Sequence, residues 1–209
     1  MRLEATIFAD GEPCSQSLRK RLSKARFTIA LDGAAEKARK EGWVPNLIAG
    51  DFDAVTKGTL RFFEKKGSMI LHTPDQNYTD LEKAIAWCTL RDADSIWIAQ
   101  ATGGRLDHTF ANLSFLKRFH SAERELVLWQ ERERVFFLRG GKCRLAGKIG
   151  RRIAVLPFPE CTASSRGLEY ELRNTKLELG IRESVANRAT RKVVELALKG
   201  EALVSEGHG

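Results

Sequence analysis

The sequence has few cysteines and no long apolar run. Its four cysteines are scattered without a C-x-x-C pair, which argues against a zinc knuckle or a disulfide framework and favours a reducing compartment. Charged residues interrupt the first 12 positions, and no uncharged apolar stretch is long enough to cross a bilayer. We therefore expect a cytoplasmic protein with neither a signal peptide nor a membrane partner.

Two further motif classes are missing. No segment matches G-x-x-x-x-G-K-[ST], which excludes a P-loop enzyme. No internal repeat or low-complexity segment is evident. What remains is a chain of 209 residues, 43% hydrophobic and 30% charged, which is the composition of a soluble globular protein with ample material for a core.

Positive charge is unevenly distributed. The formal net charge is +8, and residues 117–152 carry 11 Lys and Arg against four Glu. Three interpretations are open for this segment: a solvated face, steering of a polyphosphate substrate, or binding of nucleic acid. It shows no recognisable nucleic-acid-binding motif, so we expect no nucleic-acid partner.

The pattern of apolar runs predicts two domains. Up to residue 139, short apolar strands alternate with amphipathic helices, which indicates a Rossmann-like α/β domain with a mostly parallel sheet. From residue 125 onward, short strand-like runs punctuated by Gly and Pro are typical of a β-sandwich, and residues 168–172 alternate strictly as a half-buried strand does. We place the boundary near Gly140-Gly141, giving an α/β domain at 1–139 and a β-sandwich at 140–209.

Three acid-bearing segments, 50–53, 73–80 and 103–108, each follow a predicted strand. Loops that leave the carboxyl ends of neighbouring strands in an open α/β sheet converge on one crevice. Bare carboxylates brought that close repel each other, and a hard divalent cation such as Mg²⁺, bridging to substrate phosphates, relieves the repulsion. The pattern therefore predicts a metal–nucleotide site at five acids: Asp51, Asp53, Asp75, Asp80 and Asp107.

The spacing of Asp51 and Asp53 allows two interpretations. In an extended segment, residues two apart point the same way, so both carboxylates can grip one metal. Alternatively, one of them caps the helix that begins near Thr56.

Thr79 and Glu82 match a capping box, which places a helix start in the second acidic segment. Asp80 and Lys83 then share a face, where the acid can approach a metal and the ammonium a phosphate. The alternative is an ordinary surface ion pair.

Glycines follow two of the predicted strands. Gly33, after Asp32, allows close approach of a ligand to the backbone, and Gly103-Gly104 can cradle phosphate oxygens with backbone N–H groups. The glycine pair also fits a plain turn. For the helix that follows we expect the core face to consist of Leu106, Phe110, Leu113, Leu116 and Phe119.

Together these segments resemble one known family. The blocks at 32–33, 50–53, 73–83 and 103–108, in this order and spacing, look like those of the thiamin pyrophosphokinase family, and 167–170 with 184–187 resembles its C-terminal signature. The resemblance implies a homodimer with an α/β nucleotide-binding domain and a β-sandwich, the thiamin site being shared between subunits. It also implies Mg²⁺-dependent transfer of diphosphate from ATP to the thiamin hydroxyl, with release of AMP.

The resemblance also implies roles for individual residues. The implied metal ligands are Asp51, Asp53, Asp75 and Asp80, which with Lys83 form the catalytic set. The implied nucleotide-binding residues are Asp32, Gly33, Gln76, Thr79, Gly103, Gly104, Arg105, Asp107 and His108. The implied thiamin-binding residues are Tyr170, Ser184 and Asn187. The general base is left open between Asp80 and Asp75.

Several positions depart from the family pattern. Tyr170 stands where a tryptophan is usual, Ala186 where a serine is usual, and Ala54 where a serine usually follows the D-x-D. The changes at Tyr170 and Ala186, in the segments implied to bind thiamin, motivate a second hypothesis. In it, the protein is a relative that transfers diphosphate to the hydroxyl of a different acceptor molecule. A third, from another class, is a nucleic-acid-binding protein that uses residues 117–152.

Overall fold

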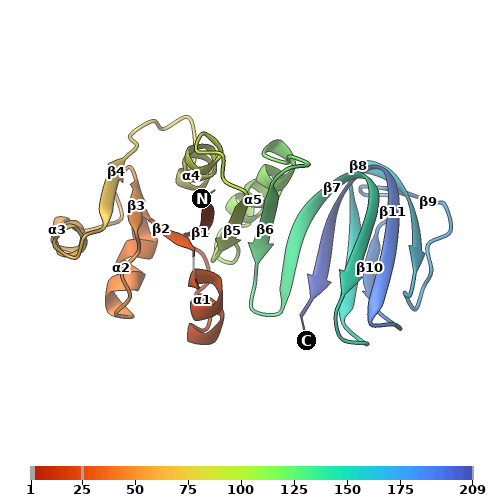
Figure 1. The fold of residues 1–209 in the computed structure, drawn as a ribbon. Coiled ribbons are helices and arrows are strands. Elements are labelled where there is room, and N and C mark those ends of the chain that lie inside the picture. Colours follow the sequence, from red (N-terminus) through yellow and green to blue (C-terminus); the bar gives the residue numbers. More distant parts are fainter. Residues whose placement is uncertain (1–2, 25, 209) are drawn as a thin grey trace. The chain divides into compact units, whose positions relative to one another are not determined.

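The computed structural model describes residues 3–24 and 26–208 as two compact units, Met1–Glu131 and Arg132–Gly209 (Figure 1). The two units divide between Glu131 and Arg132, eight residues before the position at which we placed the domain boundary. Gly140 and Gly141, both with positive φ, sit inside strand β7 (Glu133–Ala146), so they mark a bend within a strand instead of a linker. No helix among the described residues is long and apolar enough to span a membrane.

The first unit is a parallel six-stranded sheet with the order β6-β5-β1-β2-β3-β4. The strands are β1 (Glu4–Phe8), β2 (Phe27–Leu31), β3 (Leu47–Gly50), β4 (Met69–His72), β5 (Ser95–Ala99) and β6 (Glu125–Trp129). The helices are α1 (Gln16–Ser23), α2 (Asp32–Lys40), α3 (Lys57–Lys65), α4 (Asp80–Thr89) and α5 (Leu106–Arg118). The strands β2, β3 and β4 are added in order on one side of β1, and β5 and β6 are added on the other side. Because the order reverses at β1, a crevice forms between the loops that follow β1 and β5.

Side-chain caps fix three helix starts. The hydroxyls of Ser15, Thr56 and Thr79 accept hydrogen bonds from N–H groups three residues ahead, at 3.1–3.2 Å. Thr56 therefore caps α3, and the alternative in which Asp51 or Asp53 does so is wrong.

The predicted capping box of α4 is half correct. Thr79 caps the helix as expected, but the Glu82 carboxylate is paired with Arg118 on α5, with Nη1 and Oε1 2.5 Å apart. The ion pair joins α4 to α5 instead of closing the box. The apolar stripe of α4 is buried as predicted, at Leu81, Ala84, Ile85 and Cys88.

The predicted core face of α5 is wrong at its start. Leu106 and Phe110 are 85% and 62% exposed. Asn112, which is not among the predicted core residues, is buried, and its amide donates a hydrogen bond to the carbonyl of Ala101 at 2.7 Å. The fully buried positions of α5 are Asn112, Phe115 and Leu116.

The second unit consists of antiparallel strands, in keeping with the predicted fold class. They are β7, β8 (Arg152–Arg166), β9 (Thr175–Glu178), β10 (Ser184–Arg188) and β11 (Val193–Gly207), ordered β10-β8-β11-β7 with β9 also on β8. Both ends of the long strands contribute to one core: Val155 and Ala163 of β8 lie in it with Leu196 and Val204 of β11. Long strands that bend over a shared core replace the many short ones predicted.

Residues 168–172 form a loop, although their alternation predicted a strand. Leu168 and Leu172 are buried as the pattern requires, but no continuous ladder is recorded for these residues: an isolated bridge joins Leu168 to Ala189, and the N–H of Ser165 in β8 donates to the carbonyl of Leu172 at 2.9 Å. Side chains replace the ladder: Asn187 accepts from the N–H of Tyr170 at 3.1 Å and donates to its carbonyl at 2.8 Å. Local side-chain bonding has overridden the strand pattern.

Candidate active site

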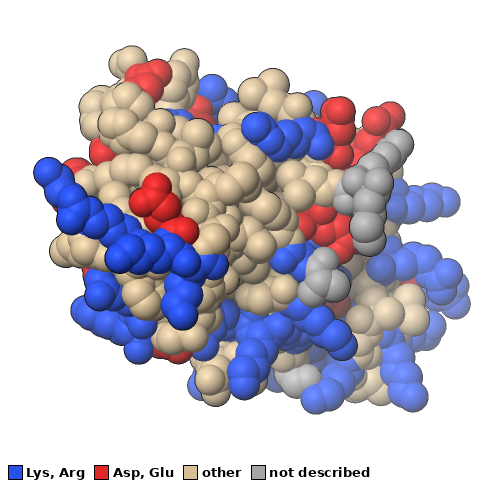
Figure 2. Space-filling model, turned by 60° about the vertical axis from the view of Figure 1, so that its left-hand side comes forward, with Lys and Arg blue, Asp and Glu red and all other residues tan. Residues whose placement is uncertain are grey.

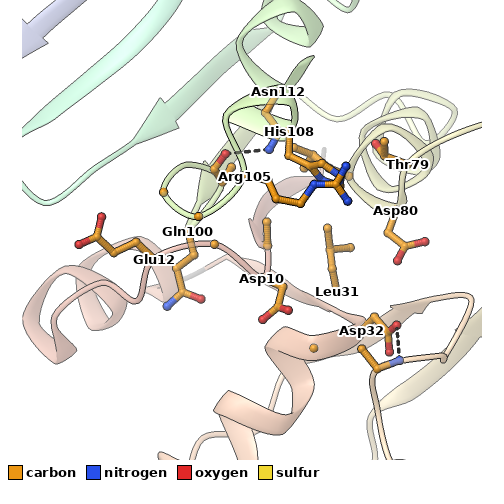
Figure 3. A pocket seen from close by; sticks show the side chains of 18 of the residues that line it. Asp10, Glu12, Leu31, Asp32, Thr79, Asp80, Gln100, Arg105, His108 and Asn112 are labelled. Atoms are coloured by element: carbon orange, nitrogen blue, oxygen red, sulfur yellow. Dashed lines mark hydrogen bonds between the residues drawn. The ribbon is translucent and has the colours of Figure 1, made fainter. Parts of the chain in front are cut away.

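A pocket of about 930 Å³ opens in the first unit, at the crevice where the strand order reverses (Figure 3). Its walls come from the loops after β1, β2, β3 and β5 and from the starts of α4 and α5. The polar lining side chains are Asp10, Glu12, Asp32, Asp53, Thr79, Asp80, Gln100, Arg105, His108 and Asn112. Segments far apart in the sequence thus meet at one edge of the sheet, as the strand-end pattern predicts.

Three carboxylates converge beside this pocket. One oxygen each from Asp32, Asp51 and Asp80 lies within 4.8 Å of the other two. Gly50 makes room for them, because a Cβ at this position would lie 3.0 Å from the Cβ of Asp32 and 3.1 Å from Oδ2 of Asp80. We call Asp32, Asp51 and Asp80 the carboxylate triad; the sequence placed Asp51 and Asp80 at the metal and assigned Asp32 to the nucleotide.

Asp32 is the buried member of the triad, only 6% exposed. Its Oδ2 accepts a hydrogen bond from the N–H of Ala54 at 3.0 Å, while its buried Oδ1 has no hydrogen-bond partner. Burial raises the pKa of Asp32 to about 6, and the nearby Asp53 and Asp80 add to the rise. A buried oxygen without a partner is unfavourable, and hard carboxylate ligands suit a divalent ion, so the triad fits Mg²⁺.

Asp51 is oriented by its neighbours in the 50–77 region. Gln76 Nε2 donates to Asp51 Oδ2 at 2.8 Å, and this bond lowers the pKa of the Asp51 carboxyl. The segment is not extended, since Phe52 has φ 66°. Asp51 joins the triad, whereas Asp53 lines the pocket and interacts with Asp32 and Asp51 from outside the triad. Gln76, expected at the nucleotide, positions a triad carboxylate.

Lys83 ties the triad to the loop before α4. Its Nζ lies 2.8 Å from Asp80 Oδ1 and donates to the carbonyls of Thr73 at 2.6 Å and Asp75 at 3.2 Å. The side chains of Lys83 and Asp80 are only 13% and 23% exposed, which distinguishes the pair from an ordinary surface ion pair. Here the ammonium braces the loop before α4 and pairs with one oxygen of Asp80.

Three of the five predicted acids lie outside the triad: Asp53, described above, and Asp75 and Asp107. Asp75 is exposed, and its Oδ1 accepts from both the N–H and the side-chain amide of Asn77 at 2.9 Å. Asp107 pairs with Arg105, whose Nη2 lies 2.5 Å from Asp107 Oδ2. That hydrogen bond lowers the pKa of Asp107 to about 2. Asp75 closes a local turn, and Asp107 orients Arg105 at the pocket.

The three glycines predicted to bind the nucleotide, Gly33, Gly103 and Gly104, serve two purposes. A Cβ at Gly33 would lie 2.3 Å from an oxygen of Asp10, so Gly33 makes room for a side chain of the chain itself. Gly103 makes room for Glu12 in the same way, at 2.7 Å from its Cβ. Gly104, with φ 71°, has nothing within 4 Å of a Cβ position and faces open space, as a phosphate-binding turn requires.

Sequence reasoning missed Asp10 and Glu12, which follow β1 and line the pocket. The strand-end rule, which we used for the acids after β3, applies equally to those after β1. The same rule also places Asp32, the first residue after β2, beside Asp51 and Asp80.

The residues expected at thiamin lie in the second unit. Tyr170 is 70% exposed, whereas Asn187 is buried and holds the backbone of the Tyr170 loop with its amide. Ser184 begins β10, and Ala186 beyond it has φ 56° in an irregular part of the ladder. The Asn187 side chain thus positions the loop, and Tyr170 presents its ring to the surface.

The fold and the site together indicate a class of protein. A parallel α/β sheet whose crevice joins a carboxylate triad, a basic side chain and an open glycine turn is suited to a phosphate-bearing ligand with a metal ion, as kinase-type enzymes bind. The family model described as thiamin pyrophosphokinase, catalytic domain, matches residues 18–128. The chain belongs to the thiamin pyrophosphokinase family.

Individual relatives agree with this assignment. Thiamin pyrophosphokinase 1 of Caenorhabditis elegans is 31% identical over 95% of this chain and 87% of its own length. The crystal structure of thiamine pyrophosphokinase from Bacillus subtilis shares the fold with a TM-score of 0.85 at 22% identity, over 98% of this chain and 99% of that one. The enzyme from Candida albicans superposes with a TM-score of 0.85 at 18% identity, over 99% and 90%.

Proposed function

We propose that the protein catalyses Mg²⁺-dependent transfer of the diphosphate group of ATP to the hydroxyl of thiamin, giving thiamin diphosphate and AMP. The observation that carries this proposal is the carboxylate triad, whose three oxygens lie within 4.8 Å at the mouth of a crevice in a family of thiamin pyrophosphokinases. Asp32, Asp51 and Asp80 would hold the ion. Mg²⁺ there neutralises charge on the phosphate oxygens of ATP.

The protein's own residues position the nucleotide. Arg105 lines the pocket beside the open turn at Gly104, and Asp107 fixes its guanidinium, so a cation is directed toward the phosphates. Of the two carboxylates considered as general base, Asp80 lines the pocket and Asp75 is outside its lining. This supports Asp80 as the residue placed to reach a substrate hydroxyl.

Charge in the second unit supports attraction of a polyphosphate. Residues 132–209 carry 16 Lys and Arg against nine Asp and Glu, so nearly all of the +8 lies there. Figure 2, in which the left-hand side of Figure 1 is turned forward, shows that Lys and Arg side chains also spread over this face, while Asp and Glu occupy smaller patches. A positive field of this kind raises the rate at which ATP meets the enzyme and weakens with salt.

Exposed apolar side chains in the second unit support a homodimer. Tyr170, Leu179, Ile181 and Val185 are 50–74% exposed, and three of them lie on or beside β10 and the turn before it. Such a concentration of large apolar groups on a small unit is typical of an interface. We assign a second copy of the chain as the partner and Tyr170, Ser184 and Asn187 to the acceptor site.

The alternative function is transfer of diphosphate to a hydroxyl compound other than thiamin. Tyr170 and Ala186, which replace the residues usual in the family, favour this alternative. The deciding experiment is incubation with Mg-ATP and thiamin, followed by chromatography of the products. AMP and thiamin diphosphate in equal amounts are expected. AMP formed only with other alcohols would establish the alternative, and ADP with thiamin monophosphate would refute diphosphate transfer.

A further inference from the structure

Glu12 is an acidic side chain of the pocket that the metal site does not use. It lies at the opposite side of the view in Figure 3 from Asp80 and Asp32. Asp10 beside it is neutralised by Lys37, whose Nζ is 2.8 Å away. In the part of the chain that the structure describes, the Glu12 carboxylate has no hydrogen-bond or ion-pair partner. An unpaired carboxylate near a triphosphate repels it unless the carboxylate faces donor groups of the ligand.

The backbone holds Glu12 in place. Its N–H donates to the carbonyl of Thr102 at 2.8 Å, which joins the loop after β1 to the loop after β5. Pro13 follows and restricts Glu12 to an extended conformation. Gly103 packs against it without a side chain, since a Cβ there would lie 2.7 Å from that of Glu12. The backbone of Glu12 is therefore held beside the turn at Gly103-Gly104, from which its side chain reaches the pocket.

We propose that Glu12 accepts hydrogen bonds from the ribose hydroxyls of the nucleotide and makes the enzyme select ribonucleotides over deoxyribonucleotides. The inference rests on the proposed function, which places ATP in this pocket. Two vicinal hydroxyls match the two oxygens of a carboxylate, and acids that follow a strand hold the ribose in dinucleotide-binding sheets in this way. The phosphates, being anionic, are bound by Arg105 and the backbone of the glycine turn, so the sugar is the part of ATP that offers donors to an acid.

The test is direct binding, without turnover. Titration calorimetry with Mg²⁺ and α,β-methylene-ATP, in which the bond to be cleaved is blocked, is compared with its 2′-deoxy and 3′-deoxy counterparts. The wild type should bind at least one deoxy analogue about tenfold to a hundredfold more weakly, the range for a hydrogen bond to a charged acceptor. Glu12→Gln and Glu12→Ala should bring this ratio close to one.

Glu64→Gln is the matched control, since Glu64 is an exposed acid of α3 outside the pocket lining. It should keep the wild-type ratio. Tight binding of the ribonucleotide without discrimination, or discrimination that survives Glu12→Ala, overturns the inference and leaves the proposed function intact. Failure of the wild type to bind the ribonucleotide analogue overturns both.

Discussion

The N–H of Ala54 donates a hydrogen bond of 3.0 Å to Oδ2 of Asp32, and this contact ties the first residue of α2 to the loop that carries Asp51 and Asp53. One oxygen of the buried carboxylate is thereby fixed, and the other, Oδ1, is left for a cation. The loops after β2 and β3 thus act as a unit.

The triad should separate two acids that look alike in the sequence. Asp51→Asn removes a triad ligand and should lower kcat/KM roughly a hundredfold or more, because a metal contributes several kcal/mol of transition-state stabilisation. Asp75→Asn, outside the triad, should lower it less than about fivefold. Steady-state assays on both variants, with circular dichroism to verify folding, check this. Equal losses in the two variants would contradict the assignment.

Asp32 should make the metal-free protein less stable as the pH rises. Its pKa in the folded protein is about 6, above the usual 3.8, so the folded state holds the proton more tightly than the unfolded state. This contribution to stability is full below about pH 4 and is lost between about pH 4 and 6. Asp32→Asn should therefore be more stable than the wild type above pH 6 in EDTA, by on the order of 1–3 kcal/mol.

Urea unfolding at several pH values measures the difference in unfolding free energy between the wild type and Asp32→Asn. This difference should vanish near pH 4. At pH 7.5 it should decrease when Mg²⁺ is added, since the ion stabilises the ionised form of the wild type. A difference independent of both pH and Mg²⁺ would show that Asp32 is not the titrating group.

Lys83 should matter for geometry as much as for charge. Lys83→Met removes the bonds to the carbonyls of Thr73 and Asp75 and the ion pair with Asp80. We expect a loss of about 1–3 kcal/mol in unfolding free energy and a large fall in kcat. Lys20→Met, at an exposed lysine of α1, is the control and should change neither. Wild-type turnover in Lys83→Met would refute a role in bracing the site.

Ile181 should lie at the interface of the proposed dimer. Ile181→Glu places a charge on a side chain that is 74% exposed in the single chain and would be desolvated between two copies. Light scattering after size exclusion should show a dimer for the wild type and a monomer for the variant. Leu90→Glu, at a residue of the first unit that is 82% exposed, should remain dimeric. A monomeric wild type would contradict the dimer.

Strand ends and helix caps were the features that could be predicted from local sequence. Thr79 caps α4 as predicted, and the acid-bearing segments follow strands as predicted, because caps and apolar runs depend on neighbours in the chain. The convergence of acid-bearing loops followed from the topology of parallel sheets. These rules suffice to locate the crevice.

The features that were missed depend on partners distant in the sequence. The face of α5 was set by the bond from Asn112 to Ala101, and Glu82 was taken by Arg118. The segment from Asp51 to Asp53 is not extended as expected, because Phe52 adopts a positive φ, which its residue type does not indicate. Asp32 was placed at the nucleotide because it was considered with Gly33 and not with the ends of neighbouring strands.

The most direct measurement is anomalous diffraction from crystals soaked with MnCl₂ and α,β-methylene-ATP, with Mn²⁺ standing in for Mg²⁺. We expect an anomalous peak with carboxylate oxygens of Asp32, Asp51 and Asp80 about 2.1–2.3 Å away, the range for a hard divalent ion. A nucleotide bound in the pocket with no peak at these three residues, or with the ion held elsewhere, would contradict the metal site on which the proposed reaction depends.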